Sequence, residues 1–149
     1  MDITLNHITI IISAFGVFVA LIALIWQTRQ TNEQMKLNFF ADYTKRYQEI
    51  LLNLPYEINS PDFDFTSLKA GKRERTLRYI QAYFDLCSEE YYLNKAGKID
   101  KKVWLEWEEG IRYTFSKQAY KKAWDIIKLD SQFYGDFHKW LLENEMIDG

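Results

Sequence analysis

The pattern of apolar and polar positions separates an apolar N-terminal run from a longer, amphipathic remainder. From Ile8 to Trp26, every residue is uncharged and none is proline. As a helix, this run would be roughly 28 Å long at about 1.5 Å per residue, close to the ~30 Å hydrocarbon core of a bilayer. The pattern predicts a transmembrane helix over residues 8–26, after a short extracytoplasmic tail over residues 1–7.

Small and weakly polar residues recur in this run at alternating spacings of three and four. Extended both ways, they define a seam: Asn6, Thr9, Ser13, Gly16, Ala20, Ala23, Gln27, Gln30 and Gln34. A repeat of 3.5 residues is typical of helix–helix contacts, and in lipid small residues let helices approach closely. We therefore expect a homo-oligomer in the lipid bilayer. The alternative is that such residues are simply common in membrane helices, although Ala14 is the one small residue of the run outside the seam.

After Trp26 there is no glycine or proline before Pro55, so the helix is expected to continue as a cytoplasmic stalk over residues 27–54. Thr31 and Gln34 fit a capping box, which leaves a break near Thr31 as an alternative. An apolar stripe predicts a stalk face that packs against the rest of the domain. Its members are Phe40, Tyr43, Tyr47, Ile50 and Leu54.

Turn-forming residues predict a loop over residues 56–71, and helical periodicity predicts four further helices. The first runs over residues 72–94 before Gly97, the second is capped by Asp100, the third starts at Ser116, and the fourth is capped by Ser131. The expected inward residues, in chain order, are Leu77, Ile80, Phe84, Cys87, Tyr91, Val103, Trp104, Trp107, Ile111, Phe115, Ala119, Tyr120, Ala123, Trp124, Ile127, Phe133, Phe137, Trp140 and Leu141. The predicted fold is all-α: one long N-terminal transmembrane and stalk helix, followed by a cytoplasmic bundle of about four helices over residues 55–149 that packs with the stalk as one domain.

Charge predicts the orientation. All 19 Lys and Arg residues follow the apolar run, starting at Arg29. The positive-inside rule then places the N-terminus outside and the rest of the chain in the cytoplasm, in a bacterial inner membrane. A cleaved signal peptide would need a basic region before the run and a small-residue cleavage site, whereas the run ends in Trp26-Gln27-Thr28-Arg29. A single cysteine, Cys87, excludes an intrachain disulfide.

Candidate catalytic chemistry is sparse. The two histidines, His7 and His138, lie in no recognisable motif, and we expect a structural or surface role for His138. No spacing typical of metal ligands, phosphate loops or nucleophile elbows occurs. The acidic residues Glu89, Glu90, Glu106, Glu108 and Glu109 are interpreted as solvated helix faces. The sequence predicts a protein that is not an enzyme, with no cofactor and no metal.

A basic cluster surrounds the expected start of the helix over residues 72–94: Lys69, Lys72, Arg73, Arg75 and Arg78. The helix dipole disfavours cations there, so the cluster needs an explanation. Pairing with Glu57, Asp62 and Asp64, or solvation alone, is favoured over binding of anionic lipid headgroups or RNA.

Several segments carry a resemblance. These are Trp26-Gln27-Thr28-Arg29-Gln30, Phe40-Ala41-Asp42-Tyr43-Thr44-Lys45-Arg46-Tyr47-Gln48-Glu49-Ile50 and Tyr83-Phe84-Asp85-Leu86-Cys87-Ser88-Glu89-Glu90. With the apolar run, they resemble a group of small bacterial single-pass membrane proteins of unknown function, some of which accompany phage-defence systems. The layout is similar to that of the membrane accessory protein of type VI-B, RNA-targeting CRISPR systems. That resemblance implies an oligomeric membrane pore acting with a CRISPR nuclease. The Arg-to-His motif of HEPN-type ribonucleases is missing before His138.

Two functions follow from these expectations. The leading one is an oligomeric inner-membrane protein that perturbs or permeabilises the membrane, as a pore-type accessory or effector in antiphage defence. The alternative is a membrane-tethered adaptor whose helical domain recruits a protein or RNA partner through the basic cluster. An enzyme with an unrecognised site at His138 ranks third.

Overall fold

The computed structural model describes residues 2–129 and 134–148, and at positions 2–6 and 9 it describes the backbone alone. Every regular element in these residues is a helix, which confirms the predicted all-α class. The chain divides into two compact units, residues 1–45 and residues 46–149. The second unit therefore begins inside the segment predicted as a stalk.

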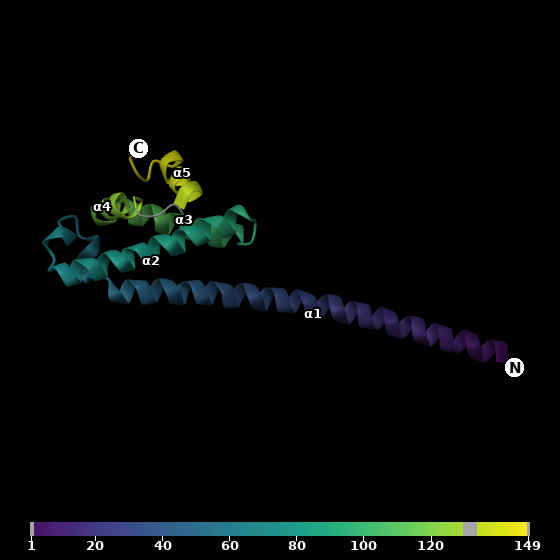
Figure 1. The fold of residues 1–149 in the computed structure, drawn as a ribbon. Coiled ribbons are helices and arrows are strands. Elements are labelled where there is room, and N and C mark those ends of the chain that lie inside the picture. The colour runs from purple at the N-terminus through teal and green to yellow at the C-terminus, as the bar shows by residue number, and fades with distance from the viewer. Residues whose placement is uncertain (1, 130–133, 149) are drawn as a thin grey trace. The chain divides into compact units, whose positions relative to one another are not determined.

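Helix α1 runs from Asp2 to Asn53 without a break (Figure 1). The alternative of a break near Thr31 is wrong, because good helix formers continue through that position and no glycine or proline interrupts them. The helix ends just before Leu54 and Pro55, as expected from the steric bias that proline places on the residue before it.

The predicted loop contains two short 3-10 helices, η1 (Tyr56–Asn59) and η2 (Phe65–Ser67). Asp64 begins η2: its carboxylate accepts hydrogen bonds from the Thr66 backbone N–H at 3.0 Å and from the Thr66 hydroxyl at 2.7 Å. Phe65 is 1% exposed, so this segment contributes to the core of the second unit.

The four further helices predicted from periodicity are present. They are α2 (Ala70–Lys95), α3 (Lys101–Phe115), α4 (Gln118–Ile127) and α5 (Gly135–Glu143). The Asp100 cap is confirmed, since its carboxylate accepts the Lys102 N–H at 2.8 Å. The predicted helix start at Ser116 is wrong, because the Ser116 hydroxyl donates back to the Tyr113 carbonyl oxygen at 2.6 Å and so helps to end α3. The predicted cap Ser131 lies outside the described residues.

Aromatic side chains fill the core of the second unit, where α2, α3, α4 and α5 meet. Trp124 of α4 is 0% exposed. Its ring lies edge-on to Phe84 of α2 at 5.0 Å, to Phe115 of α3 at 5.7 Å and to Phe137 of α5 at 5.8 Å between centroids. One tryptophan of α4 therefore contacts the three other helices of the bundle.

Most expected inward residues are buried, and the exceptions lie at the edges of the core. Those that are only half-buried are Leu77, Tyr91, Val103, Trp107 and Trp140, and Phe133 lies outside the described residues. In the predicted stripe, Ile50 of α1 and Leu54 directly after the helix are buried as predicted, whereas Phe40 is 44% and Tyr47 is 40% exposed.

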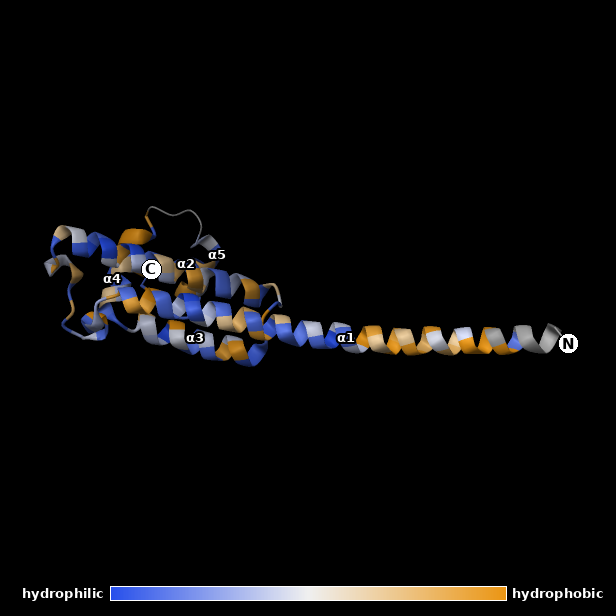
Figure 2. Cartoon of the chain, turned by 90° about the horizontal axis from the view of Figure 1, so that it is seen from below, coloured by the Kyte–Doolittle hydropathy of each residue, from blue (hydrophilic) through white to orange (hydrophobic). Residues whose placement is uncertain are grey.

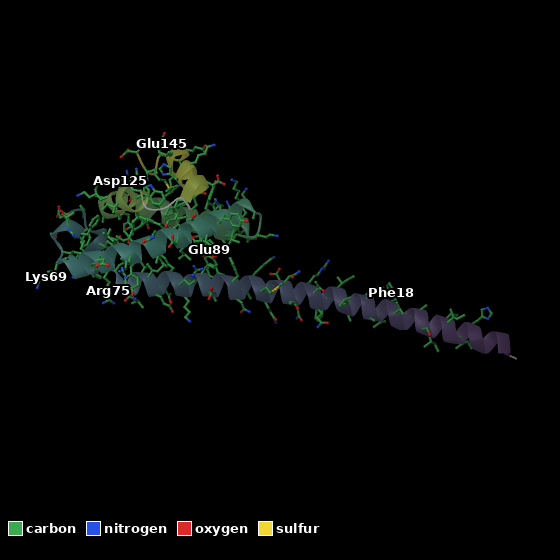
Figure 3. The ribbon with its side chains drawn as sticks, in the orientation of Figure 1. Phe18, Lys69, Arg75, Glu89, Asp125 and Glu145 are labelled. Carbon is green, nitrogen blue, oxygen red and sulfur yellow. The ribbon has the colours of Figure 1, made fainter. Side chains whose placement is uncertain are left out.

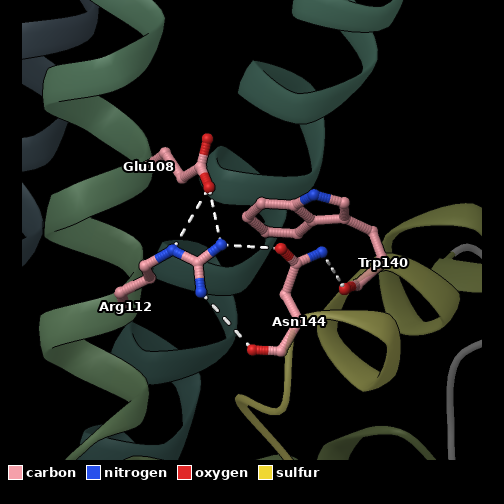
Figure 4. Close-up of polar contacts among 4 residues, drawn as sticks. All are labelled: Glu108, Arg112, Trp140 and Asn144. Carbon is pink, nitrogen blue, oxygen red and sulfur yellow. Dashed lines mark hydrogen bonds and ion pairs between the residues drawn. The ribbon is translucent and has the colours of Figure 1, made fainter.

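A polar contact attaches the end of α5 to α3 (Figure 4). Arg112 of α3 donates to the Asn144 side-chain oxygen at 2.6 Å and to the Asn144 backbone carbonyl at 3.4 Å. Glu108, one turn earlier in α3, accepts from the same guanidinium at 2.7 Å. Glu108 is thus half-buried and paired, not a fully solvated face as the sequence suggested.

Candidate functional site

The apolar part of α1 is the most distinctive surface of the chain. Helix α1 is long and apolar enough to cross a membrane, and none of the residues in its most apolar window is buried. Figure 2 shows this part as a nearly continuous apolar stretch, and Figure 3 shows Phe18 projecting outward from it. A helix satisfies its own backbone hydrogen bonds, which is the requirement for an element in hydrocarbon.

The seam residues lie along this helix. Ser13, Gly16, Ala20, Ala23, Gln27, Gln30 and Gln34 are all exposed in the single chain. The side chains of Asn6 and Thr9 lie outside the described residues. A Cβ atom built on Gly16 meets no atom within 4 Å. Larger side chains at this position would therefore not disturb the single chain, and any effect they have would report on a neighbouring molecule.

The basic cluster lies on the first turns of α2, with Lys69 at the residue before the helix (Figure 3). Arg75 donates to the Asn53 side-chain oxygen at 3.0 Å and lies 5.8 Å from the centre of the Tyr79 ring. Arg78 pairs with Glu74 at 2.6 Å.

Pairing of this cluster with the preceding loop or solvation alone was expected from the sequence, and the described residues show the cluster exposed to solvent. Among the residues that the structure describes, no member of the cluster forms an ion pair with Glu57, Asp62 or Asp64. Asp64 is used to begin η2, and the hydrogen bonds from Thr66 lower the pKa of its carboxyl group. Lys72 and Arg73 remain exposed cations.

A buried polar cluster lies between α2 and the last turns of α1, and the sequence analysis missed it. Glu90 is 7% exposed, which contradicts its interpretation as part of a solvated face. Burial raises the pKa of Glu90 to about 8, against the smaller opposing effect of Arg46. The signal was present in the sequence: Tyr83, Cys87 and Glu90 follow one another at spacings of four and three, which places Glu90 on a buried stripe.

His138 is half-buried beside the core, with its ring against Trp124. Its ring stacks on Trp124, with 5.9 Å between centroids and 17° between planes. Its Nδ1 atom and the Trp124 Nε1 atom are buried without a hydrogen-bond partner among the described residues. This arrangement supports a structural role for His138. No group of three metal-ligating side chains occurs within residues 2–129 and 134–148.

An open cavity of about 450 Å³ lies between α2 and α5. Its acidic lining residues are already engaged. Asp136 accepts from Lys95 at 2.7 Å, which lowers the pKa of Asp136, and Asp85 accepts a short hydrogen bond from Tyr134. Burial, followed by the Asp85 hydrogen bond, raises the pKa of Tyr134.

Comparison with known proteins adds no relative: no family model, no curated protein and no solved structure matches this chain.

Proposed function

We propose that this chain is a membrane-anchored helical protein of the bacterial inner membrane that oligomerises through the seam and permeabilises the membrane. Its role would be that of a pore-type accessory or effector in antiphage, CRISPR-type defence. The N-terminus would lie outside, and the helical bundle would face the cytoplasm. The proposal assigns no catalytic step and no cofactor to the chain.

The full exposure of the apolar part of α1 carries this proposal. Nearly every residue from Ile10 to Trp26 is a large apolar or small side chain that is exposed, and several large ones are more than half exposed. Water would oppose this exposure by roughly 25 cal/mol for each Å² of apolar surface, so lipid or another protein must cover the helix.

The seam supports self-association as the way in which the anchors meet. Apolar burial drives little association within lipid, so close packing of small residues such as Gly16 and Ala20 becomes the main attraction. The seam then continues as Gln27, Gln30 and Gln34, whose amide groups suit a polar mouth. A lumen wide enough for ions or metabolites would need several helices around it.

The test is dye leakage from vesicles that contain the full-length protein. Gly16→Leu combined with Ala20→Leu adds bulk to the seam and should abolish both leakage and the oligomer. Ala14→Leu is the control, because it makes the same change as Ala20→Leu at the one small residue off the seam, and it should leave both unchanged. Equal leakage from the seam variant and the wild type would overturn the proposal.

The second candidate is a membrane-tethered adaptor, favoured by the exposed basic cluster. Lys69, Lys72 and Arg73 make no ion pair with a described residue, in a chain whose net charge is −2. Such a local excess of positive charge suits an anionic partner, such as RNA or an acidic protein surface.

Charge reversal separates the two candidates. Lys72→Glu with Arg73→Glu should abolish function if the chain is an adaptor, while replacement of the apolar part of α1 by an unrelated membrane helix should not. Lys101→Glu with Lys102→Glu, at the start of α3, is the control for a change in net charge. The opposite pattern, with sensitivity only to the apolar helix, would exclude the adaptor.

A further inference from the structure

A carboxyl group is buried where the last turns of α1 pack on α2. Glu90 is 7% exposed, and its carboxyl group lies near Arg46 of α1. Its cationic neighbour, Arg46 on α1, is paired with Glu89 at 2.8 Å. Because Arg46 is shared with Glu89, an ionised Glu90 carboxylate would be only weakly compensated for the hydration that it loses on burial, which is unfavourable.

The other groups around Glu90 offer no compensating positive charge. Tyr83 uses its hydroxyl to donate to the Thr114 hydroxyl at 3.0 Å, and the Tyr47 ring lies 6.1 Å from the Tyr83 ring. By element, the titratable and charged groups of this cluster are Arg46 and Tyr47 on α1, Tyr83, Cys87 and Glu89 on α2, Tyr113 on α3 and Tyr120 on α4. Arg46 is the single cation among them.

We propose that Glu90 is a proton-controlled latch: its neutral carboxyl group lets the last turns of α1 pack on α2, and loss of the proton loosens that packing. The latch is a property of residues 46–149 and goes beyond the membrane function proposed above. It does not require that the apolar part of α1 enters a bilayer.

The direction of the pH effect follows from linkage. Burial raises the pKa of Glu90 from 4.5 to about 8, so the folded chain holds a proton that the unfolded chain has already lost. The stabilisation is therefore complete below about pH 4.5 and is lost as the pH rises through about 8. Between pH 7 and pH 9, the equilibrium for opening this packing should increase roughly tenfold.

Cys87 provides a natural reporter. It is the single cysteine of the sequence, it lies one turn before Glu90, and its thiol is 1% exposed. Burial raises the pKa of this thiol and keeps reagents away from it, so the folded chain protects it from modification. Opening of the α1–α2 packing exposes it.

The experiment measures the rate at which Ellman's reagent modifies Cys87 in the full-length chain in detergent micelles. Each rate is divided by the rate for the chain unfolded in denaturant at the same pH, which removes the effect of thiol ionisation. In the wild type, this ratio should rise roughly tenfold from pH 7 to pH 9.

Two variants decide the cause. Glu90→Gln keeps the size but removes the charge, so its ratio should change by less than about twofold over the same range. Glu89→Gln, which removes the exposed partner of Arg46, should keep the wild-type pH dependence. If Glu90→Gln does not fold, Glu90→Met replaces it with the same expectation. A flat ratio in the wild type, or an unchanged pH dependence in the Glu90 variants, would overturn the latch.

Discussion

At the scale of single residues, two positions in the described chain have a left-handed backbone: Gly97 with φ 66° and Glu145 with φ 56°. Each follows a helix, and at both positions the same two backbone N–H groups, that of the left-handed residue and that of the next one, donate to carbonyl oxygens in the last turns of the helix. After α5, the Met146 N–H donates to the Leu141 carbonyl at 3.0 Å and the Glu145 N–H to the Leu142 carbonyl at 3.0 Å. Glycine adopts this backbone freely, whereas a residue with a Cβ atom does so at a cost.

Glu145→Gly should therefore stabilise the chain. The left-handed conformation costs a residue with a side chain about 1–2 kcal/mol, and glycine removes this cost. Glycine also has more conformational freedom in the unfolded chain, which cancels part of the increase in the free energy of unfolding. The expected increase in the free energy of unfolding is about 0.5–1 kcal/mol, measured by urea denaturation. Gly97→Ala is the reciprocal control and should lower the same quantity by about 1 kcal/mol. A loss of stability in Glu145→Gly would contradict this account of the C-terminal turn.

The sequence predicts residues whose chemistry is local and misses those whose role depends on packing. Asp100 and Gly97 were found because a helix start favours a short acceptor and a helix end favours glycine. The residues beside Glu145 in the sequence do not indicate a left-handed backbone. Glu90 lies beside Glu89 in the sequence, and the pair suggested a solvated face, although only Glu89 reaches solvent.

At the scale of elements, the bundle depends on the contact that α4 makes with its neighbours. Trp124→Ala should lower the free energy of unfolding by roughly 3–5 kcal/mol, because it removes a fully buried ring and leaves a cavity among Phe84, Phe115 and Phe137. Trp140→Ala, at a half-buried position, should cost clearly less. Equal losses in the two variants, measured by chemical denaturation, would show that Trp124 is not the centre of the core.

Helix periodicity predicts the elements well, and local polar contacts decide where they end. In α4, the pattern predicts that positions 119, 120, 123, 124 and 127 face inward, and all five side chains are buried. The start of α4 was predicted two residues too early, since Ser116 can cap one helix or close the previous one. Its hydroxyl donates to the Tyr113 carbonyl oxygen, so it closes α3.

At the scale of the whole molecule, the chain consists of an exposed apolar helix and a separately packed helical unit. The sequence predicts the all-α class and the apolar helix because both follow from residue patterns within one chain. Association between chains cannot be read from one chain in the same way, because the surfaces that would meet a partner and those that would meet lipid are equally exposed. Gly16 and Phe18, for example, are both exposed on α1. Only the partner, whether lipid or a second copy, distinguishes these two faces.

The most direct test of the central claim is the mass of the full-length protein in detergent, measured by light scattering with the detergent contribution subtracted. One chain has a mass of 17.9 kDa. The account predicts a closed oligomer of about six or more chains, because a lumen needs several helices around it. A monomer or dimer would contradict the pore and would leave the tethered adaptor as the function of this protein.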